Sequence, residues 1–155
     1  MYTAITVRQV LQSKGQGFWW IGPTAMAFDA LGVMAEKNVG ALLVMERGKL
    51  VGIFSERDYA RKVILQGKSS RSTSVGELMS GNPICAKPDM SLPECMVLMA
   101  NHQIRHLPVL ENGAVIGMLS NRDVVHAIIA AQEHTIEQLE NYVSGNDYTA
   151  RLAVR

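Results

Sequence analysis

The fold is decided by one stretch, Gly52-Ile53-Phe54-Ser55-Glu56-Arg57-Asp58, which recurs 65 positions later as Gly117-Met118-Leu119-Ser120-Asn121-Arg122-Asp123. Both copies read glycine, two apolar residues, serine, one variable residue, arginine and aspartate. The same offset aligns positions upstream of the stretch: Pro23 with Pro88, Ala35 with Ala100, Leu42 with Leu107, Val44 with Val109 and Gly48 with Gly113. A repeat of this length predicts two copies of one structural unit.

The two copies account for most of the 155 residues. They cover residues 5–67 and 73–132, and a C-terminal helix and tail follow over 133–155. Near the start of each copy the offset grows to 68, so that residues 7–11 align with residues 75–79. One copy alone would bury too little apolar surface to be stable. We therefore expect the two copies to share one hydrophobic interface.

The strands of each copy are predicted from short apolar runs bounded by turn residues. They cover residues 18–21, 41–45 and 50–54 in the first copy, and residues 84–86, 106–110 and 114–119 in the second. Trp19 and Trp20 are adjacent, so on a strand they face opposite sides. One of the two is expected in the core.

The helix after the first strand of each copy shows apolar residues at the spacing i, i+3, i+4, i+7. The two stripes are Ala27, Ala30, Leu31 and Met34 in the first copy and Leu92, Cys95, Met96 and Met99 in the second. Ser55 and Ser120 each open the last helix of a copy, and the second of these helices is predicted to reach Tyr142 before a loose tail over 144–155. The fold class is therefore α/β, with two tandem β-α-β-β-α units packed about a pseudo-twofold axis.

The composition argues against several classes of function. The net charge is +1, with 15 basic and 14 acidic residues, so no general field attracts nucleic acid or anionic lipid. The N-terminus lacks the pattern of a secretion signal, and no apolar run is long enough to span a bilayer. Cys85 and Cys95 favour two free thiols in a reducing compartment, with a disulfide as the alternative. We expect a cytoplasmic protein with no membrane partner.

The order of elements and the repeated Gly-apolar-x-Ser-x-x-Asp ending resemble the cystathionine-β-synthase (CBS) domain, and the tandem copies resemble a CBS pair, or Bateman module. The resemblance covers about residues 5–132, and residues 55–67 are similar to small stand-alone bacterial CBS-pair proteins. It implies a regulatory ligand module rather than an enzyme, with no required cofactor. The ligand it implies is an adenosine compound such as AMP, ATP, NAD(H) or S-adenosylmethionine, bound between the repeats. It also implies a disc-shaped homodimer and a regulated partner that the sequence does not identify.

The resemblance also assigns roles to residues. In the family, the aspartate of the Ser-x-x-Asp sequence holds the ribose hydroxyls, which implies Asp58 and Asp123 here. Basic residues before the middle strand hold phosphate, which implies Arg105 and His106. The first copy departs from this pattern, because Gly40-Ala41 stands at the equivalent place. Its cleft either borrows Arg105 across the pseudo-twofold axis, takes Arg61 or Lys62, or stays empty.

The adenine slot is implied by family position as well. Ile21 and Ile84, each on the first strand of a copy, are the candidates for its apolar walls. Plain packing in the core is the alternative for both side chains.

The chemistry of the repeated stretch agrees with these roles. An ionised carboxylate accepts hydrogen bonds from both hydroxyls of a ribose. Ser55 and Ser120 can donate to phosphate, and Arg57 and Arg122 can reach it as planar forks. Free N–H groups at the start of the helix favour an anion. The same Ser-x-x-Asp sequence is also an ordinary helix cap, and the two roles are compatible.

Other chemistry has little support in the sequence. His102, His126 and His134 show no metal-ligand spacing, and no nucleophile–base set or phosphate-cradling glycine loop is present. We therefore predict neither a metal site nor catalytic residues. The alternative to a nucleotide sensor is a structural dimerisation or interaction module that works without a ligand.

Overall fold

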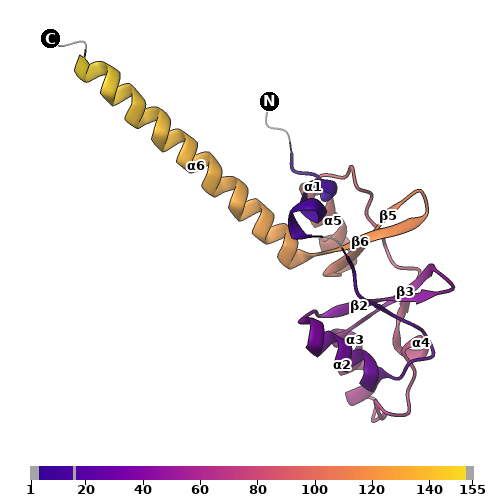
Figure 1. Ribbon diagram of the computed structural model, residues 1–155. Coiled ribbons are helices and arrows are strands. Elements are labelled where there is room, and N and C mark those ends of the chain that lie inside the picture. Colours follow the sequence, from indigo (N-terminus) through magenta and orange to yellow (C-terminus); the bar gives the residue numbers. More distant parts are fainter. Residues whose placement is uncertain (1–3, 16, 153–155) are drawn as a thin grey trace.

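The computed structural model describes residues 4–15 and 17–152. Figure 1 shows two α/β halves and one long helix that projects from the second half. The first half contains β1 (Trp20–Ile21), α2 (Ala27–Lys37), β2 (Ala41–Glu46), β3 (Lys49–Ser55), α3 (Glu56–Tyr59) and the π-helical turn η1 (Ala60–Ile64). The second half contains α5 (Leu92–His102), β5 (His106–Glu111), β6 (Ala114–Ser120) and α6 (Asn121–Leu152). The predicted mixed α/β class with two tandem repeats is confirmed.

Three short elements lie near the starts of the two repeats. These are α1 (Val7–Lys14) in the first repeat, and α4 (Val75–Leu78) and β4 (Ser80–Gly81) in the second. The first half carries a four-stranded sheet in the order β1-β2-β3-β4, and the second carries the β5-β6 hairpin. In both hairpins the serine that opens the last helix lies opposite the first residue of the middle strand.

The two lead-in helices α1 and α4 are exchanged between the halves. Helix α1 belongs to the first repeat, yet Val7 and Val10 lie in the core of the second half. Helix α4 belongs to the second repeat, yet Val75 and Leu78 lie in the core of the first half. Figure 1 shows α1 beside α5 and α4 near the helices of the first half. Each half is therefore completed by a segment from outside its own repeat.

Equivalent hydrogen bonds fix both lead-in helices. The Val7 N–H donates to the Met90 carbonyl at 2.9 Å, and the Val75 N–H donates to the Ala25 carbonyl at 2.8 Å. The exchange thus follows the pseudo-twofold symmetry of the repeat.

The repeated glycines Gly52 and Gly117 allow close packing beside the lead-in helices, because neither residue has a side chain. A Cβ at Gly52 would lie 2.6 Å from Met79 Sδ and 2.8 Å from the Ser80 carbonyl oxygen. A Cβ at Gly117 would lie 2.9 Å from both methyl carbons of Leu11. Met79 and Leu11 are equivalent residues beside the two lead-in helices, so each glycine makes room for the exchanged segment.

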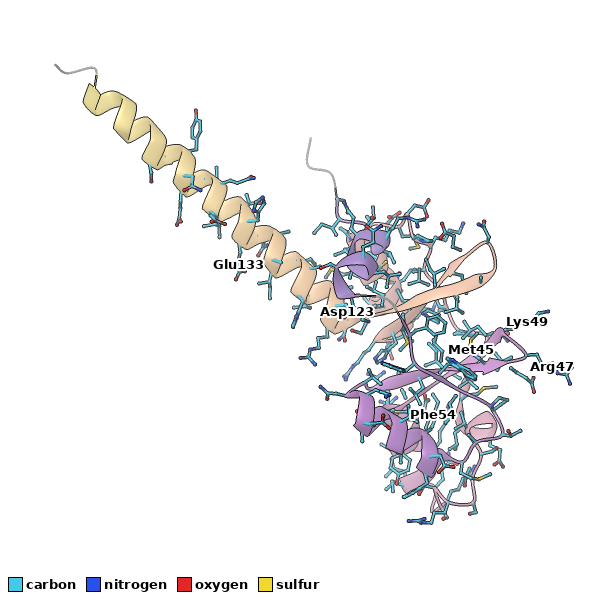
Figure 2. The ribbon with its side chains drawn as sticks, in the orientation of Figure 1. Met45, Arg47, Lys49, Phe54, Asp123 and Glu133 are labelled. Atoms are coloured by element: carbon cyan, nitrogen blue, oxygen red, sulfur yellow. The ribbon has the colours of Figure 1, made fainter. Side chains whose placement is uncertain are left out.

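A third hydrophobic cluster joins the halves. Its buried residues are Ala41, Leu43 and Met118, and its half-buried members are Phe18, Met45, Leu50, Ile53 and Val115. Figure 2 shows Met45 between the two hairpins, whereas Phe54 points into the first half. The expected shared interface is therefore present, and it is built from the hairpin faces.

Some sequence predictions on the strands are wrong. Residues 84–86 form no strand, and only Ala86 makes an isolated bridge to Val109. Pro83 and Pro88 bracket the segment, and neither can donate a ladder hydrogen bond. Both tryptophans are exposed, Trp19 by 46% and Trp20 by 58%, because β1 has only two residues at the edge of its sheet.

Two predictions on the helices are also wrong. Met96 is exposed, because α5 buries only the narrower stripe of Leu92, Cys95 and Met99. The loose tail predicted from residue 144 continues as helix to Leu152, and residues 153–155 lie outside the described chain. A glycine inside a helix costs only about 1 kcal/mol, which is too little to end a helix of this length.

No helix in the described part of the chain is both long and apolar enough to cross a membrane. Cys85 and Cys95 are free thiols, and burial raises the pKa of each.

Candidate functional site

The first repeat holds its aspartate in a capping box at the start of α3. The Ser55 backbone N–H donates to Asp58 Oδ2 at 3.0 Å, and the Asp58 N–H donates to Ser55 Oγ at 3.2 Å. The second oxygen, Asp58 Oδ1, lies 3.1 Å from Lys62 Nζ and 3.5 Å from Ser80 Oγ. Lys62 also donates to the Leu78 carbonyl at 2.8 Å, which ties α4 to the site. We call this group, Ser55, Asp58, Lys62 and Ser80, the first cap site.

The second repeat repeats the capping box at the start of α6. The Ser120 N–H donates to Asp123 Oδ2 at 2.8 Å, and the Asp123 N–H donates to Ser120 Oγ at 3.1 Å. Lys14 Nζ reaches in from α1, donating to Asp123 Oδ2 at 2.8 Å and to the Met118 carbonyl at 2.9 Å. We call this group, Lys14, His106, Ser120 and Asp123, the second cap site. Figure 2 shows Asp123 where α6 leaves the second half.

The second cap site is partly buried, which perturbs its titrating groups. Burial alone would raise the pKa of Asp123, but the hydrogen bonds from Lys14 and Ser120 and the Lys14 charge outweigh it, so this pKa is lowered. Burial lowers the pKa of His106; Asp123 opposes this shift, and the charges of Lys14, Arg105 and Arg57 add to it. At neutral pH the site therefore holds an ionised carboxylate beside a neutral imidazole.

His106 also lies at the seam between the halves. It pairs with Ser120 across the β5-β6 hairpin. A Cβ at Gly40 would lie 3.7 Å from Glu56 Oε2 and 3.8 Å from His106 Cε1. Glu56 of the first repeat and His106 of the second thus both lie near Gly40, at ordinary van der Waals distance from a Cβ at that position.

A basic hollow of about 520 Å³ opens along the same seam. Its lining residues are Arg57, Arg61, Met99, Ala100, His102, Gln103, Ile104 and Arg105. Arg57 is fixed across the seam, because its Nη1 donates to the Gln103 carbonyl at 2.9 Å. Among the described lining residues there are three arginines and one histidine and no carboxylate. We call this feature the seam hollow.

The seam hollow bears on which basic residues serve the cleft of the first repeat, where Gly40-Ala41 replaces the basic pair. Arg61 and Arg105 both line it beside Arg57, whereas Lys62 points to the first cap site. The structure therefore brings together Arg57 and Arg105, which the sequence singled out separately.

Other predicted residues lie elsewhere. Arg122 is exposed in the first turn of α6 and does not line the seam hollow. Ile21 and Ile84 are half-buried and pack against the cores of the first and second halves. Their role in an adenine slot stays a prediction.

Sequence reasoning missed two residues of these sites. Lys14 lies 109 positions from Asp123, and nothing in its local sequence indicates the contact. His102 lines the seam hollow next to Gln103, although its spacing to the other histidines indicated nothing. Both belong to segments whose position depends on how the repeats pack. No group of three metal-binding side chains is assembled within the described residues.

Comparison with known proteins identifies the family. Residues 16–64 and 75–130 match the CBS domain, so the chain belongs to the CBS domain family. The CBS domain-containing protein CBSX3, mitochondrial, of Arabidopsis thaliana is 38% identical over 153 residues, covering 93% of this chain and 74% of its relative. Domains of this family are generally regulatory rather than catalytic.

Solved structures show the same fold. A CBS-domain protein from Burkholderia ambifaria MC40-6 is 44% identical, with a TM-score of 0.80, over 83% of this chain and 96% of that one. The CBS domain protein PAE2072 from Pyrobaculum aerophilum, solved in complex with AMP, is 24% identical, with a TM-score of 0.69. That match covers 77% of this chain and 89% of the other, and at this identity it shows the fold alone.

Proposed function

We propose that this chain is a regulatory module that binds an adenine nucleotide, of the AMP, ATP or NAD(H) type, at the seam between its repeats. The observation that carries the proposal is the seam hollow, where Arg57, Arg61 and Arg105 converge without a carboxylate among the described lining residues. We further propose that the protein is cytoplasmic and acts through a partner protein or a second copy.

Phosphate is the ligand group that fits the seam hollow best. Like charges in one hollow repel each other, and a multiply charged anion relieves that repulsion. Arginine forms planar, paired hydrogen bonds with phosphate oxygens. Arg57 is already held in place by the Gln103 carbonyl, so less side-chain freedom is lost when a ligand binds.

Asp58 is the residue that we expect to bind the ribose hydroxyls. Asp58 follows Arg57 in the first turn of α3, and its capping bonds use Oδ2. Among the described residues, Oδ1 has Lys62 and Ser80 as its side-chain partners. A carboxylate has about four lone-pair positions, so capping and ribose binding can coexist.

A ligand bound at the seam can regulate the protein, because it lies between the two repeats. The seam hollow takes Arg57 and Arg61 from the first repeat and Arg105 from the second. A ligand that contacts both repeats favours one arrangement of the halves over another and shifts the equilibrium towards it. The AMP in the Pyrobaculum protein makes AMP the first ligand to test here.

A second candidate function is an interaction module that works without a ligand. It is favoured by large apolar side chains on the surface of the first half, including Trp20 (58% exposed) and Leu65 (78% exposed). In this case the clefts stay empty and the exposed faces bind a partner.

Thermal melting separates the two functions. The midpoint of the wild type is measured with AMP, ATP, NAD(H) and S-adenosylmethionine, because a ligand of the folded state raises it by mass action. Arg105→Ala should abolish the rise, and Lys49→Ala, which removes one charge from an exposed strand end, should keep it. A wild type that responds to none of these compounds supports the interaction module instead.

A further inference from the structure

Helix α6 extends well beyond the half that supports it. It runs for 32 residues, Asn121–Leu152, and Figure 1 shows it leaving the body of the protein. Val124, Ala127 and Ile128 pack against the core of the second half. Beyond these turns the described side chains from Gln132 to Gly145 are exposed, apart from the half-buried Thr135. The match to the CBS domain ends at residue 130, so this part lies outside the domain itself.

The projecting helix carries an apolar stripe with the spacing of a coiled coil. The stripe consists of Val125, Ile129, Ile136, Leu139 and Val143, with Gln132 in the gap, at alternating steps of four and three residues. All five apolar members are exposed, between 49% and 64%. In a single helix surrounded by water such a stripe has no packing partner, and helices of this kind owe most of their stability to packing.

The residue types along the stripe indicate how many helices pair. With Ile129 at heptad position a, the a positions hold Ile129, Ile136 and Val143, and the d positions hold Val125, Gln132 and Leu139. Branched residues fill all three a positions and leucine fills one d position, Leu139, and this combination favours two parallel strands. The polar Gln132 interrupts the stripe at the d position between Ile129 and Ile136.

The flanking charges favour parallel over antiparallel pairing. The e positions hold His126, Glu133 and Glu140, and the g positions hold Ile128, Thr135 and Tyr142. In a parallel pair e faces g, so each glutamate meets an uncharged side chain. In an antiparallel pair e faces e, so the glutamates of the two helices would repel each other. Figure 2 shows the Glu133 side chain on the projecting part of α6.

We propose that α6 binds the same helix of a second copy of this chain, forming a parallel two-stranded coiled coil along Val125–Val143. The side chains of the stripe do not line the seam hollow, and the pairing does not depend on a nucleotide. It therefore stands or falls separately from the proposed function.

Cysteine cross-linking of the full chain tests the pairing directly. In a parallel pair, identical d positions face each other, so Leu139→Cys should form a disulfide-linked dimer under mild oxidation. Asn141→Cys, on the outer face of the same helix, should give no more dimer than the wild type, whose Cys85 and Cys95 are half-buried and buried. Equal cross-linking of the two variants, or none for Leu139→Cys, would overturn the proposal.

Paired lysine substitutions give an independent measurement. Ile136→Lys with Leu139→Lys places two charges in the stripe, and Asn141→Lys with Ser144→Lys places two charges on the outer face at the same spacing. Sedimentation equilibrium should show at least about tenfold weaker dimerisation for the first pair and little change for the second. A monomeric wild type at about 100 μM, or two variants that dimerise alike, contradicts the pairing.

Discussion

The two halves place the same Ser-x-x-Asp sequence at the same point of the fold, yet lysines of different origin neutralise the two aspartates. Lys62 reaches Asp58 from one turn further along the same helical segment. Lys14 reaches Asp123 from α1, which is 109 residues away in the sequence. The cap is the same in both repeats, while its surroundings differ. The Ser-x-x-Asp sequence alone therefore does not distinguish the two sites, whereas the residues around it do.

The basic residues differ between the halves in the same way. The positions equivalent to Arg57, Arg61 and Arg105 are Arg122, His126 and Gly40. Arg105 is a basic residue directly before the middle strand of its repeat, whereas Gly40 occupies that position in the other repeat. The basic residues of the seam hollow are thus only partly repeated at the equivalent positions, and we expect one strong phosphate site rather than two.

The largest expected effect concerns the glycines that accommodate the exchanged segments. Gly52→Ala should lower the free energy of unfolding by about 3 kcal/mol, because its Cβ meets the Ser80 carbonyl oxygen as well as Met79. Gly117→Ala should cost only about 1 kcal/mol, because its Cβ meets the flexible end of Leu11. Urea denaturation measures both.

The control for this pair is a rescue. Leu11→Ala removes the atoms that meet a Cβ at residue 117, so the cost of Gly117→Ala should disappear in that background. Equal costs for Gly52→Ala and Gly117→Ala would show that the two halves pack their exchanged segments alike.

The next effect concerns ligand affinity on the two sides of the seam. Arg57→Ala should raise the Kd for AMP about 10- to 100-fold, because a hydrogen bond to a charged group contributes about 1.5–3 kcal/mol. The equivalent substitution, Arg122→Ala, should change it less than about twofold. Isothermal titration calorimetry measures both, and similar losses would mean that both sides bind phosphate.

A smaller effect should separate the two lysines. Lys14→Ala should lower the free energy of unfolding by about 1 kcal/mol or less, because the ion pair that it breaks is partly exposed. It should also speed hydrogen exchange of the α1 amides, because the Lys14 ammonium holds the last turn of α1 against Asp123 and the Met118 carbonyl. Lys62→Ala should leave exchange in α4 nearly unchanged, because Lys62 lies outside α4 and contacts it through the Leu78 carbonyl. Faster exchange in both helices would contradict the expected difference between Lys14 and Lys62.

The smallest effect is a dependence on pH that only the second half should show. The pKa of folded His106 lies below its ordinary value of 6.5, so the unfolded chain takes up a proton first as the pH falls. The free energy of unfolding should therefore decrease from pH 7.5 to pH 5.5 more steeply in the wild type than in His106→Ala. Asp123 does not contribute in this range, because its lowered pKa is below 3.8. Identical slopes would contradict the assignment.

Much of the fold could be predicted from the sequence because it depends on local patterns. The repeat offset located both hairpins, and the Ser-x-x-Asp capping sequences located the starts of α3 and α6. The exchange of α1 and α4 could not be predicted, because a repeat shows which segments are alike and does not show which pack together. Lys14 was missed for this reason. The seam hollow was predictable only in part, since Arg57 and Arg105 stood out while His102 depends on the docking of α5.

The most direct test compares AMP with adenosine, which lacks the phosphate, by calorimetric titration of the wild type and Arg105→Ala. If the seam hollow binds the phosphate, the wild type should bind AMP at least about tenfold more tightly than adenosine. Arg105→Ala should bind the two compounds with similar affinity. A wild type that binds both equally, or an Arg105→Ala variant that keeps the preference for AMP, would contradict the account.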